Sequence, residues 1–557
     1  MSLDVETIGP AALDPEAEQV HVRMRDGTGL ATDVYLGDDT TPRPAVLVRL
    51  PYDKSGRYTF MPQLAPHFTS RGYVFVVQDV RGKFRSGGDT MPYAHEVTDG
   101  YDTIDWITSQ PWCDGSVGMF GDSYYGYTQW AAVASGHPAL RAIVPRVTSA
   151  DIAINRTQWA GVVAPLYGAD YLAHYWVDQP IYHYDVDWAR RPLADVFNDA
   201  FTVIGARSAA FDAALRAADD PTAAGPRWRQ HPFDMLRIPV LHSVGWFDNI
   251  APESMRDYTA LTSRADRADL QYLVADATDH ENYQLSDVPI GPATDHDQND
   301  AALQRLIPVY LGPALDFFDQ TLRGRGDLGG LPPVRWRLGH DSWHEAATWP
   351  PPGTRELRLY LAGRRATADA EGGSLTSRAD SARAAVHWTH DPDNLVPSTV
   401  TDPFAFLREF PDEQTVQARP DVLTFTSDAG QRALDLVGPA RLRIRVGSSA
   451  ASMHLHAKLA DVAPDGTARM LVRGQAHVQA PDPGQTVEIS LGHTGYRLRP
   501  GHRLRVHLAC SDYPLYIWHP GTGENPWHAI RGSRNEQTLV TGGSVPSHLS
   551  ITVMGDK

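Results

Sequence analysis

Residues 1–350 alternate between short apolar runs and segments with helical spacing. The apolar runs have the length of buried strands and lie at residues 45–50, 73–80, 117–121, 140–145, 238–245 and 270–275. Between them, apolar residues recur at every third or fourth position, most clearly at residues 96–109 and 301–322. Residues 21–36 alternate around an Asp-Gly turn, which predicts a β-hairpin that opens the sheet. Strands that alternate with helices favour a mostly parallel sheet covered on both faces, and we expect residues 270–275 to be its last strand.

The pattern changes twice along the chain. From residue 146 to 236 the alternation stops, and helix-like segments rich in Tyr and Trp predict a helical cap inserted into the first domain. A Pro-rich stretch at residues 350–353 then marks a linker. Beyond it, short alternating runs separated by Gly, Pro and Asp predict an all-β sandwich or jelly roll. We therefore expect an α/β domain from residues 1–145 and 237–350, the cap from 146–236, and the jelly roll from 351–557.

Composition and charge narrow the classes of function. At 557 residues the chain is too long for one hydrophobic core, and its 42% hydrophobic and 21% charged residues are ordinary for a globular protein. The formal net charge of −17 argues against nucleic acid or an anionic membrane surface as a partner, and no run approaches the ~18 apolar residues of a membrane span. Two cysteines, Cys113 and Cys510, form neither a disulfide framework nor a metal-binding spacing. Since no apolar leader is visible, we expect a soluble cytoplasmic protein, either a monomer or a homo-oligomer.

The motif G-D-S-Y-Y-G at residues 121–126 lies where a predicted strand meets a predicted helix. A serine on a sharp strand-to-helix turn is typical of the nucleophile elbow of hydrolases. Such a turn needs residues without bulk around the serine, and Gly121 and Gly126 meet that need. The spacing G-x-S-x-x-G is one residue longer than the common motif. A Gly-rich turn with a serine near a helix N-terminus is the structural alternative, because serine is favoured there anyway.

Two further residues complete the group that a serine nucleophile needs. A serine hydroxyl becomes reactive when a neutral imidazole takes its proton and a carboxylate orients that imidazole. In doubly wound hydrolases these residues follow the chain order Ser, Asp or Glu, His. Here Ser123 is followed by Asp248 at the end of one predicted strand and by His280 after the next. Active sites of such sheets form at the carboxyl ends of the strands, so we predict that the three side chains meet.

Other carboxyl and imidazole groups compete for two of these roles. Asp276 is also typical of a helix cap or a turn, and Asp279 is the direct neighbour of His280 in a loop, where neighbours rarely point at each other. His242 lies inside a predicted strand, which is typical of a structural histidine. We therefore predict Asp248 as the acid and His280 as the base.

A tyrosine and a backbone N–H are the predicted oxyanion donors. Tyr52 follows the apolar run at residues 45–50, so its phenol can reach the same edge of the sheet as Ser123. Tyr124 stands at the start of the elbow helix, where the first backbone N–H groups have no partner within the helix. A packed tyrosine with a satisfied hydroxyl is the alternative interpretation of Tyr52.

The sequence indicates no metal site and no cofactor. It has 23 histidines but no H-E-x-x-H motif, and its two cysteines are too far apart in sequence to form a metal-binding motif. His454 and His456 share one face of a predicted strand, but two ligands are too few for a cupin-like metal site. We therefore expect a protein that works without metal or cofactor.

Several longer motifs stand together in this chain. They are M-R-D-G at 24–27, P-Y-D-K at 51–54, Q-D-V-R-G at 78–82, D-T-I-D-W-I at 102–107, Q-P-W-C-D-G at 110–115, the elbow, G-W-F-D at 245–248 and A-K-L-A-D-V-A-P-D-G at 457–466. In combination they resemble the cocaine esterase / X-Pro dipeptidyl-peptidase family of serine hydrolases, and most closely its bacterial cocaine-esterase branch. The resemblance spans residues 20–553 and implies an α/β-hydrolase fold with an inserted helical cap and a C-terminal jelly roll. Where the family usually has a Gly-Pro-Trp-like segment before its histidine, this chain has D-A-T-D at 276–279.

The resemblance also implies a role for each residue of the site. It places the nucleophile on Ser123, the acid on Asp248, the base on His280, and the oxyanion donors on the Tyr52 phenol and the Tyr124 N–H. The implied reaction is hydrolysis of an ester or amide bond of a small molecule through an acyl-enzyme. Acyl transfer to another acceptor, an amide-forming step and X-Pro dipeptidyl-peptidase activity would use the same triad. A carbohydrate-binding protein with an inert hydrolase part is the alternative outside the enzymes.

The substrate pocket is expected to be aromatic. Three segments supply candidates for its lining. They are Trp159 and Tyr167 of the cap, Trp246 and Phe247 after the strand at 238–245, and Phe404 and Phe406 in a loop of the sandwich. Acidic residues of the cap such as Asp170 would favour a cationic or α-amino acyl group if they faced the pocket.

Overall fold

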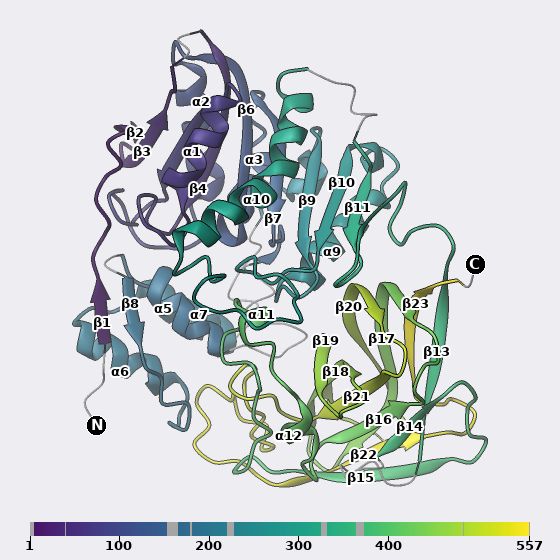
Figure 1. Ribbon diagram of the computed structural model, residues 1–557. Helices are drawn as coiled ribbons and strands as arrows, with labels where there is room; N and C mark the ends of the chain where they lie inside the picture. The colour runs from purple at the N-terminus through teal and green to yellow at the C-terminus, as the bar shows by residue number, and fades with distance from the viewer. Residues whose placement is uncertain are drawn as a thin grey trace.

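The structure is a computed structural model that covers most of the chain. The residues it describes are 5–38, 41–152, 165–178, 181–219, 228–324, 331–363, 372–482 and 484–555. Figure 1 shows two large β-structures, one in the upper part of the view and one, green to yellow, in the lower right. A smaller group of helices lies below the first of them, beside the N-terminal segment of the chain.

In the described part of the chain, ten strands form a mixed sheet. In spatial order these strands are β12 (Trp343–Ala346), β11 (Val334–Arg337), β10 (Gln271–Asp276), β9 (Val240–Gly245), β7 (Leu140–Arg146), β6 (Cys113–Asp122), β4 (Arg43–Leu50), β5 (Val74–Asp79), β3 (Gly29–Tyr35) and β2 (Glu18–Arg23). The strands from β11 to β5 run parallel, and antiparallel pairs with β12, β3 and β2 form the two edges. The predictions of a mostly parallel sheet and of an opening hairpin are confirmed.

Helices cover both faces of this sheet. They are α1 (Met61–Ser70), α2 (Glu96–Thr108), α3 (Ser123–Ser135), α9 (Ala251–Thr262) and α10 (Asp300–Thr321). Val46 and Val48 of β4 pack with α1 and α10, whereas Ala45 and Leu47 pack with α2, α3 and α9, because successive strand residues point to opposite faces. Since both faces are covered, β4 and β5 are buried along their whole length, which explains their continuous apolar runs.

The prediction that residues 270–275 form the last strand is wrong. β11 pairs in parallel with β10, and β12 pairs antiparallel with β11. Each of these two strands is only four residues long, and many of their residues are polar and partly exposed. A short strand at the edge of a sheet buries few side chains, so it leaves no apolar run in the sequence.

A separate group of elements follows β7. It comprises α5 (Leu166–His174), β8 (Ile181–Tyr184), α6 (Ala194–Ile204), α7 (Ala209–Asp219) and α8 (Pro232–Met235). Its aromatic side chains pack largely on one another, as Trp176 does on Phe197 and Phe211 with ring centroids 5.1 and 4.8 Å away. β8 pairs antiparallel with β1 (Val5–Ile8), so the N-terminal segment crosses to this group (Figure 1). The helices were expected from the sequence, but this strand pair was not, because its two halves lie far apart along the chain.

The C-terminal part is rich in β-structure. Its described strands are β13 (Thr354–Ala362), β14 (Gly373–Thr376), β15 (Ala384–His390), β16 (Leu423–Ser427), β17 (Leu434–Ser448), β18 (Ser452–Val462), β19 (Ala468–Gln479), β20 (Thr486–Leu498), β21 (Arg503–Ala509), β22 (Asn535–Thr541) and β23 (His548–Met554). Leu549, Ile551 and Val553 of β23 are buried, while the residues between them are partly exposed. This alternation is the period of two that the sequence pattern predicted.

One apolar cluster joins the two large parts. Trp246, which follows β9, stacks on Trp349 at 5.0 Å, and its indole N–H donates to the carbonyl oxygen of Arg337 at 2.9 Å. Phe247 of the first part packs with Phe406 of the second. None of the helices in the described ranges combines the length and the apolar character needed to cross a membrane.

Candidate active site

Ser123 lies at a strained turn between β6 and α3. Its φ of 51° is in the left-handed region that side chains other than Gly rarely adopt. A Cβ on Gly121 would lie 2.0 Å from the Tyr125 ring, and a Cβ on Gly126 would lie 2.4 Å from the methyl group of Thr148. Both glycines of the motif are therefore required by close packing around the serine. The Thr148 hydroxyl also donates to the backbone carbonyl of Ser123 at 2.6 Å, which holds the turn in place.

The imidazole of His280 is bonded to the carboxylate of Asp248. Nδ1 of His280 lies 2.7 Å from Oδ1 of Asp248, and both side chains are buried. Asp248 follows β9 and His280 follows β10, and these strands are neighbours in the sheet. The loops beyond the two strands are tied together, since the N–H of Phe247 donates to the carbonyl of Thr278 at 2.9 Å. The structure thus brings together the two residues that the sequence predicted as acid and base.

Ser123 and His280 line the same cavity. This cavity lies at the carboxyl ends of β4, β6 and β10. Its wall also contains Tyr52, Tyr58 and Glu281. We refer to it below as the Ser123 cavity.

The two predicted oxyanion donors lie beside the serine in different ways. Tyr52 lines the Ser123 cavity, and its hydroxyl lies 2.6 Å from that of Tyr175, which directly follows α5. The phenol of Tyr124 is directed elsewhere: it donates to Oε1 of Glu96 at 2.8 Å and accepts the N–H of Tyr93 at 2.7 Å. These bonds fix the first turn of α3, whose N–H groups have no acceptor within the helix.

The competing acids and the competing histidine have other partners. Asp279 accepts the backbone N–H groups of Tyr283 at 2.9 Å and of Leu407 at 2.8 Å. Burial raises the pKa of the Asp279 carboxyl well above its usual range. Asp276 accepts the N–H of Ala277 at 2.7 Å. His242 is buried inside β9 with Nε2 2.9 Å from Oε1 of Gln271, and burial lowers its pKa to about 4.

A C-terminal segment reaches the loop that carries His280. The N–H groups of His280 and Glu281 both donate to the carbonyl oxygen of Phe404, at 3.1 and 3.2 Å. The Phe404 ring lies 5.1 Å from the imidazole of His280 and 5.4 Å from the ring of Tyr167. Further along, Arg408 in α11 (Phe406–Glu409) pairs with Asp295 at 2.8 Å. Phe404 and Tyr167 therefore lie near the base, although neither is among the side chains that line the Ser123 cavity.

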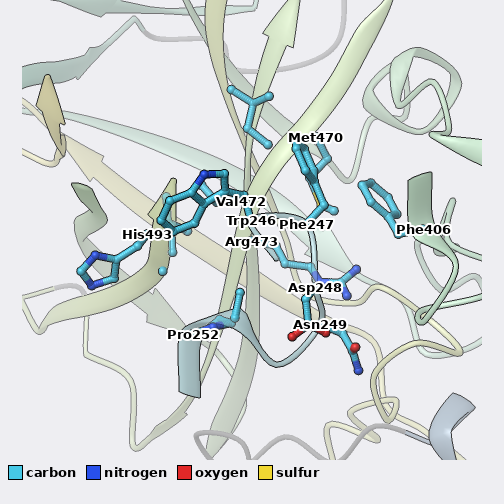
Figure 2. A pocket seen from close by; sticks show the side chains of 14 residues that line it. Trp246, Phe247, Asp248, Asn249, Pro252, Phe406, Met470, Val472, Arg473 and His493 are labelled. Carbon is cyan, nitrogen blue, oxygen red and sulfur yellow. The ribbon is translucent and has the colours of Figure 1, made fainter. Parts of the chain in front are cut away.

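The other predicted aromatic residues lie around a second cavity. This cavity lies between the two large parts and is lined by Trp246, Phe247 and Phe406, and Asp248 borders it as well. Figure 2 shows them with Arg473 of the C-terminal part at the same cavity. They do not line the Ser123 cavity. Trp159, the remaining candidate, lies outside the described residues.

A buried ion pair joins the elbow to the histidine loop. Arg146, at the end of β7, donates from Nε to Oδ1 of Asp122 at 2.9 Å and from Nη2 to Oδ1 of Asn282 at 2.8 Å. Its guanidinium lies over the Tyr310 ring, 4.1 Å from the centroid, and the Tyr310 hydroxyl donates to Asp122 at 3.0 Å. The sequence reasoning did not identify Arg146, although its place at the end of a core strand was a usable signal.

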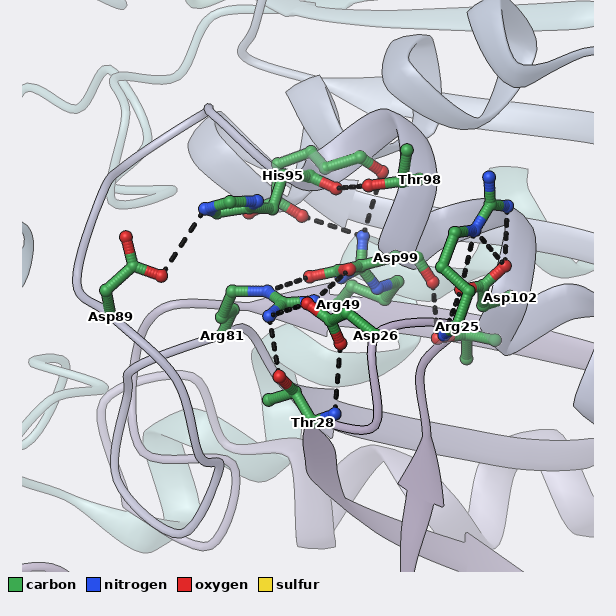
Figure 3. Close-up of polar contacts among 12 residues, drawn as sticks. Arg25, Asp26, Thr28, Arg49, Arg81, Asp89, His95, Thr98, Asp99 and Asp102 are labelled. Atoms are coloured by element: carbon green, nitrogen blue, oxygen red, sulfur yellow. Dashed lines mark hydrogen bonds and ion pairs between the residues drawn. The ribbon is translucent and has the colours of Figure 1, made fainter.

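Several residues of the recognised motifs form a structural network (Figure 3). Arg81 pairs with Asp99 and Asp26, each at 2.7 Å, so it holds the opening hairpin against α2. Arg49 pairs with Glu96 at 2.7 Å, and Glu96 in turn accepts the Tyr124 hydroxyl. This network positions the first turn of α3 and takes no direct part in the cavity.

Comparisons with known proteins agree with this architecture. The profile of the X-Pro dipeptidyl-peptidase (S15 family) matches residues 26–282, and that of the X-Pro dipeptidyl-peptidase C-terminal non-catalytic domain matches residues 328–550. The cocaine esterase of Rhodococcus sp. (strain MB1 Bresler) is 31% identical over 546 residues, which cover 91% of this chain and 92% of that protein.

Two solved structures share the fold over nearly their whole length. An α-amino acid ester hydrolase superposes with a TM-score of 0.79 at 23% identity and covers 98% of both chains. An aminopeptidase from the marine sediment archaeon Thaumarchaeota archaeon gives a TM-score of 0.77 at 22% identity and covers 99% of both chains.

These comparisons show that the chain is a serine hydrolase, with a mixed α/β sheet core and a C-terminal β-rich domain. It belongs to the family of the cocaine esterase and the X-Pro dipeptidyl-peptidases.

Proposed function

We propose that this protein hydrolyses an ester or amide bond of a small molecule through an acyl-enzyme on Ser123. The observation that supports this most directly is the 2.7 Å bond between Nδ1 of His280 and Asp248, together with a cavity that both Ser123 and His280 line. In this proposal Asp248 keeps the Nδ1 proton of His280 in place, so Nε2 is the nitrogen that accepts the proton of the serine hydroxyl. In the proposed mechanism the left-handed turn at Ser123 presents its hydroxyl to the cavity that this residue lines.

The reaction then proceeds in two stages. Oγ of Ser123 attacks the substrate carbonyl carbon while its proton moves to Nε2 of His280. The protonated imidazole gives this proton to the alcohol or amine as the carbon–oxygen or carbon–nitrogen bond breaks. Water next attacks the acyl-enzyme, loses a proton to the same nitrogen, and releases the acid and the serine.

The developing oxyanion is proposed to bind between the Tyr52 phenol and the Tyr124 N–H. Tyr175 supports the phenol: if its hydroxyl donates to the oxygen of Tyr52, the proton of Tyr52 stays available to the oxyanion. A donor that already accepts a hydrogen bond is polarised and becomes a stronger donor. Each such donor is worth about 10²–10³ in kcat in enzymes that have been tested.

The remaining parts of the chain are proposed to shape the substrate site. We assign residues 146–236 as a helical cap on the hydrolase domain (1–145 and 237–350), and residues 351–557 as a jelly roll. We propose an ester as the first substrate to test, because the cocaine esterase is the relative that shares 31% identity over most of this chain. Phe404 is the candidate that connects the C-terminal part with the site, since its carbonyl accepts the N–H of the base.

The test is hydrolysis of short activated aryl esters by the wild-type chain and by Ser123→Ala. We expect the variant to lose nearly all activity, and to lose labelling by a fluorophosphonate probe, while it folds normally. Ser135→Ala, at the other end of the same helix, is the matched control and is expected to keep both. Equal rates for wild type and Ser123→Ala would refute the proposal. Product analysis with an added amine separates hydrolysis from acyl transfer, since a transferase would yield the amide.

A further inference from the structure

Three histidines meet in the C-terminal part, outside the Ser123 cavity. His454 on β18 and His477 on β19 are direct cross-strand partners, and His519 lies in the segment that follows β21. The ring centroids are 5.0 Å apart for His454 and His477, and 4.7 Å apart for His454 and His519. One ring nitrogen of each lies within 4.8 Å of the others. The three side chains therefore converge on one point.

The three rings differ in exposure. His454 and His519 are buried, and His477 is half-buried. The point on which they converge therefore lies below the surface, with His477 on its more exposed side.

One ring nitrogen of the group lacks a hydrogen bond. Nδ1 of His454 is buried and has no hydrogen-bond partner among the described residues. Nε2 of His519 bonds to the Ser452 hydroxyl at 2.9 Å, and its Nδ1 accepts the N–H of Gly521 at 3.2 Å, a bond that an ion at Nδ1 would replace. A ligating histidine commonly uses its second nitrogen for such an outer partner, and Ser452 fills that role for His519.

His477 can adopt the same arrangement. Its Nε2 lies 3.1 Å from the side-chain nitrogen of Gln479. An amide can present either its oxygen or its nitrogen, so Gln479 can accept the Nε2 proton and leave the Nδ1 lone pair for an ion. Because His477 is half-buried, it also offers a path from solvent to the site.

We propose that His454, His477 and His519 bind one divalent late-transition-metal ion, with Zn²⁺ as the reference case, and leave a fourth position for water or an anion. Three imidazoles without a carboxylate suit Zn²⁺, Ni²⁺ or Cu²⁺ and do not suit Mg²⁺ or Ca²⁺. In a four-coordinate site with zinc–nitrogen distances of about 2.1 Å the nitrogens lie about 3.4 Å apart, so the side chains must rotate toward one another to close the site. The site is independent of the proposed hydrolysis at Ser123.

The experiment uses the full-length chain without an affinity tag, after treatment with a chelator and dialysis. Co²⁺ is the spectroscopic probe, and bound Zn²⁺ is measured by elemental analysis after equilibrium dialysis. We expect about one ion per chain, a visible Co²⁺ absorption typical of a four-coordinate site, and a higher melting temperature with Zn²⁺. His477→Gln is expected to weaken binding at least about tenfold. His387→Gln, which changes an exposed histidine of the same part, is expected to bind like wild type.

Two results would overturn the proposal. In the first, the wild-type chain retains no more metal than the His477→Gln variant does. In the second, the Co²⁺ spectrum of the His477→Gln variant is the same as that of the wild-type chain. His477 is half-buried, so this variant is expected to fold, and ester hydrolysis by the same sample verifies that it does. Loss of ester hydrolysis in wild type after chelation would contradict the stated independence of the two sites.

Discussion

The backbone N–H of His280 donates a hydrogen bond to the carbonyl oxygen of Phe404 at 3.1 Å. These residues belong to the two large parts of the chain, so the loop that carries the proposed base is held by a segment of the C-terminal part. A second bond reinforces the first, since Asp279 accepts the N–H of Leu407 at 2.8 Å. The position of the imidazole therefore depends on how the two parts pack.

The first prediction concerns the Phe404 ring, which lies against His280 and Tyr167. We expect Phe404→Ala to lower kcat/KM for an aryl ester by about tenfold or more and to reduce the free energy of unfolding by about 2 kcal/mol. The reason is that the imidazole loses the surface that fixes its orientation. Phe404→Leu keeps most of that surface and serves as the control. Steady-state kinetics measure the change in kcat/KM, and thermal melting measures the change in stability. An unchanged kcat/KM for Phe404→Ala would show that the ring does not position the base.

The second prediction separates the candidate acids. Asp248→Asn is expected to reduce kcat by about 10³–10⁴ with little loss of stability, because the amide no longer holds the required tautomer of His280. Asp276→Asn, which alters the carboxylate at the end of the neighbouring strand, is expected to stay within about tenfold of wild type. Kinetics with one aryl ester distinguish the two. A larger loss in Asp276→Asn than in Asp248→Asn would reverse the assignment.

The third prediction concerns Arg146, which bridges Asp122 of the elbow and Asn282 of the histidine loop. Arg146→Met leaves the buried carboxylate of Asp122 without its cation, and breaking such a pair typically destabilises a protein by about 3–5 kcal/mol. We expect a matching drop in the denaturant midpoint and a lower kcat. Arg141→Met, an exposed position on the same strand, should change neither. If both variants unfold alike, the bridge has no special role.

The fourth prediction tests the packing of the elbow. Gly126→Ala places a methyl group 2.4 Å from the side chain of Thr148, and backbone atoms of Gly121 stand close by. We expect a destabilisation of about 2 kcal/mol or more and loss of hydrolysis, because the turn that presents Ser123 must shift. Gly100→Ala in α2 meets no atom closer than 3.5 Å and is the tolerated control. A fully active Gly126→Ala would show that the elbow can relax without harm.

The fifth prediction concerns Glu281, which lines the Ser123 cavity and accepts the Tyr58 hydroxyl at 3.1 Å. Burial raises the pKa of its carboxyl from 4.5 to about 7. As the pH rises through about 7 the group becomes charged, so KM for an ester with an ammonium group should fall relative to KM for a neutral ester. The ratio of the two KM values removes pH effects that both substrates share, and Glu281→Gln should abolish the trend. A ratio independent of pH in wild type would contradict the prediction.

The same carboxyl affects stability with a defined sign. Because its pKa is higher in the folded protein than in the unfolded chain, the folded state binds the proton more tightly. The resulting stabilisation is complete below about pH 4.5 and is lost as the pH rises through about 7. The melting temperature of wild type relative to Glu281→Gln should therefore fall across this window.

The elements of the first sheet were predictable because each is set by local pattern. Strands covered on both faces need continuous apolar runs, and helices need an apolar residue at every third or fourth position. The chain order of Ser123, Asp248 and His280 was also informative, because parallel strands bring their carboxyl ends to one edge of the sheet. The need for Gly121 and Gly126 around the serine also followed from the motif.

Tertiary packing decided the rest. The partners of Asp279 are one example, because the backbone N–H groups of Tyr283 and Leu407 reach its carboxylate only in the folded chain. No local sequence pattern indicates the edge strands β11 and β12. The same is true of the contact of Phe404 with His280 and of the three histidines that converge in the C-terminal part. Each joins residues that are distant in sequence, and the free energy that holds them comes from burial and hydrogen bonds formed across the fold. A linear pattern records which residues are to be buried, whereas the partner of each buried group is set by how the layers pack.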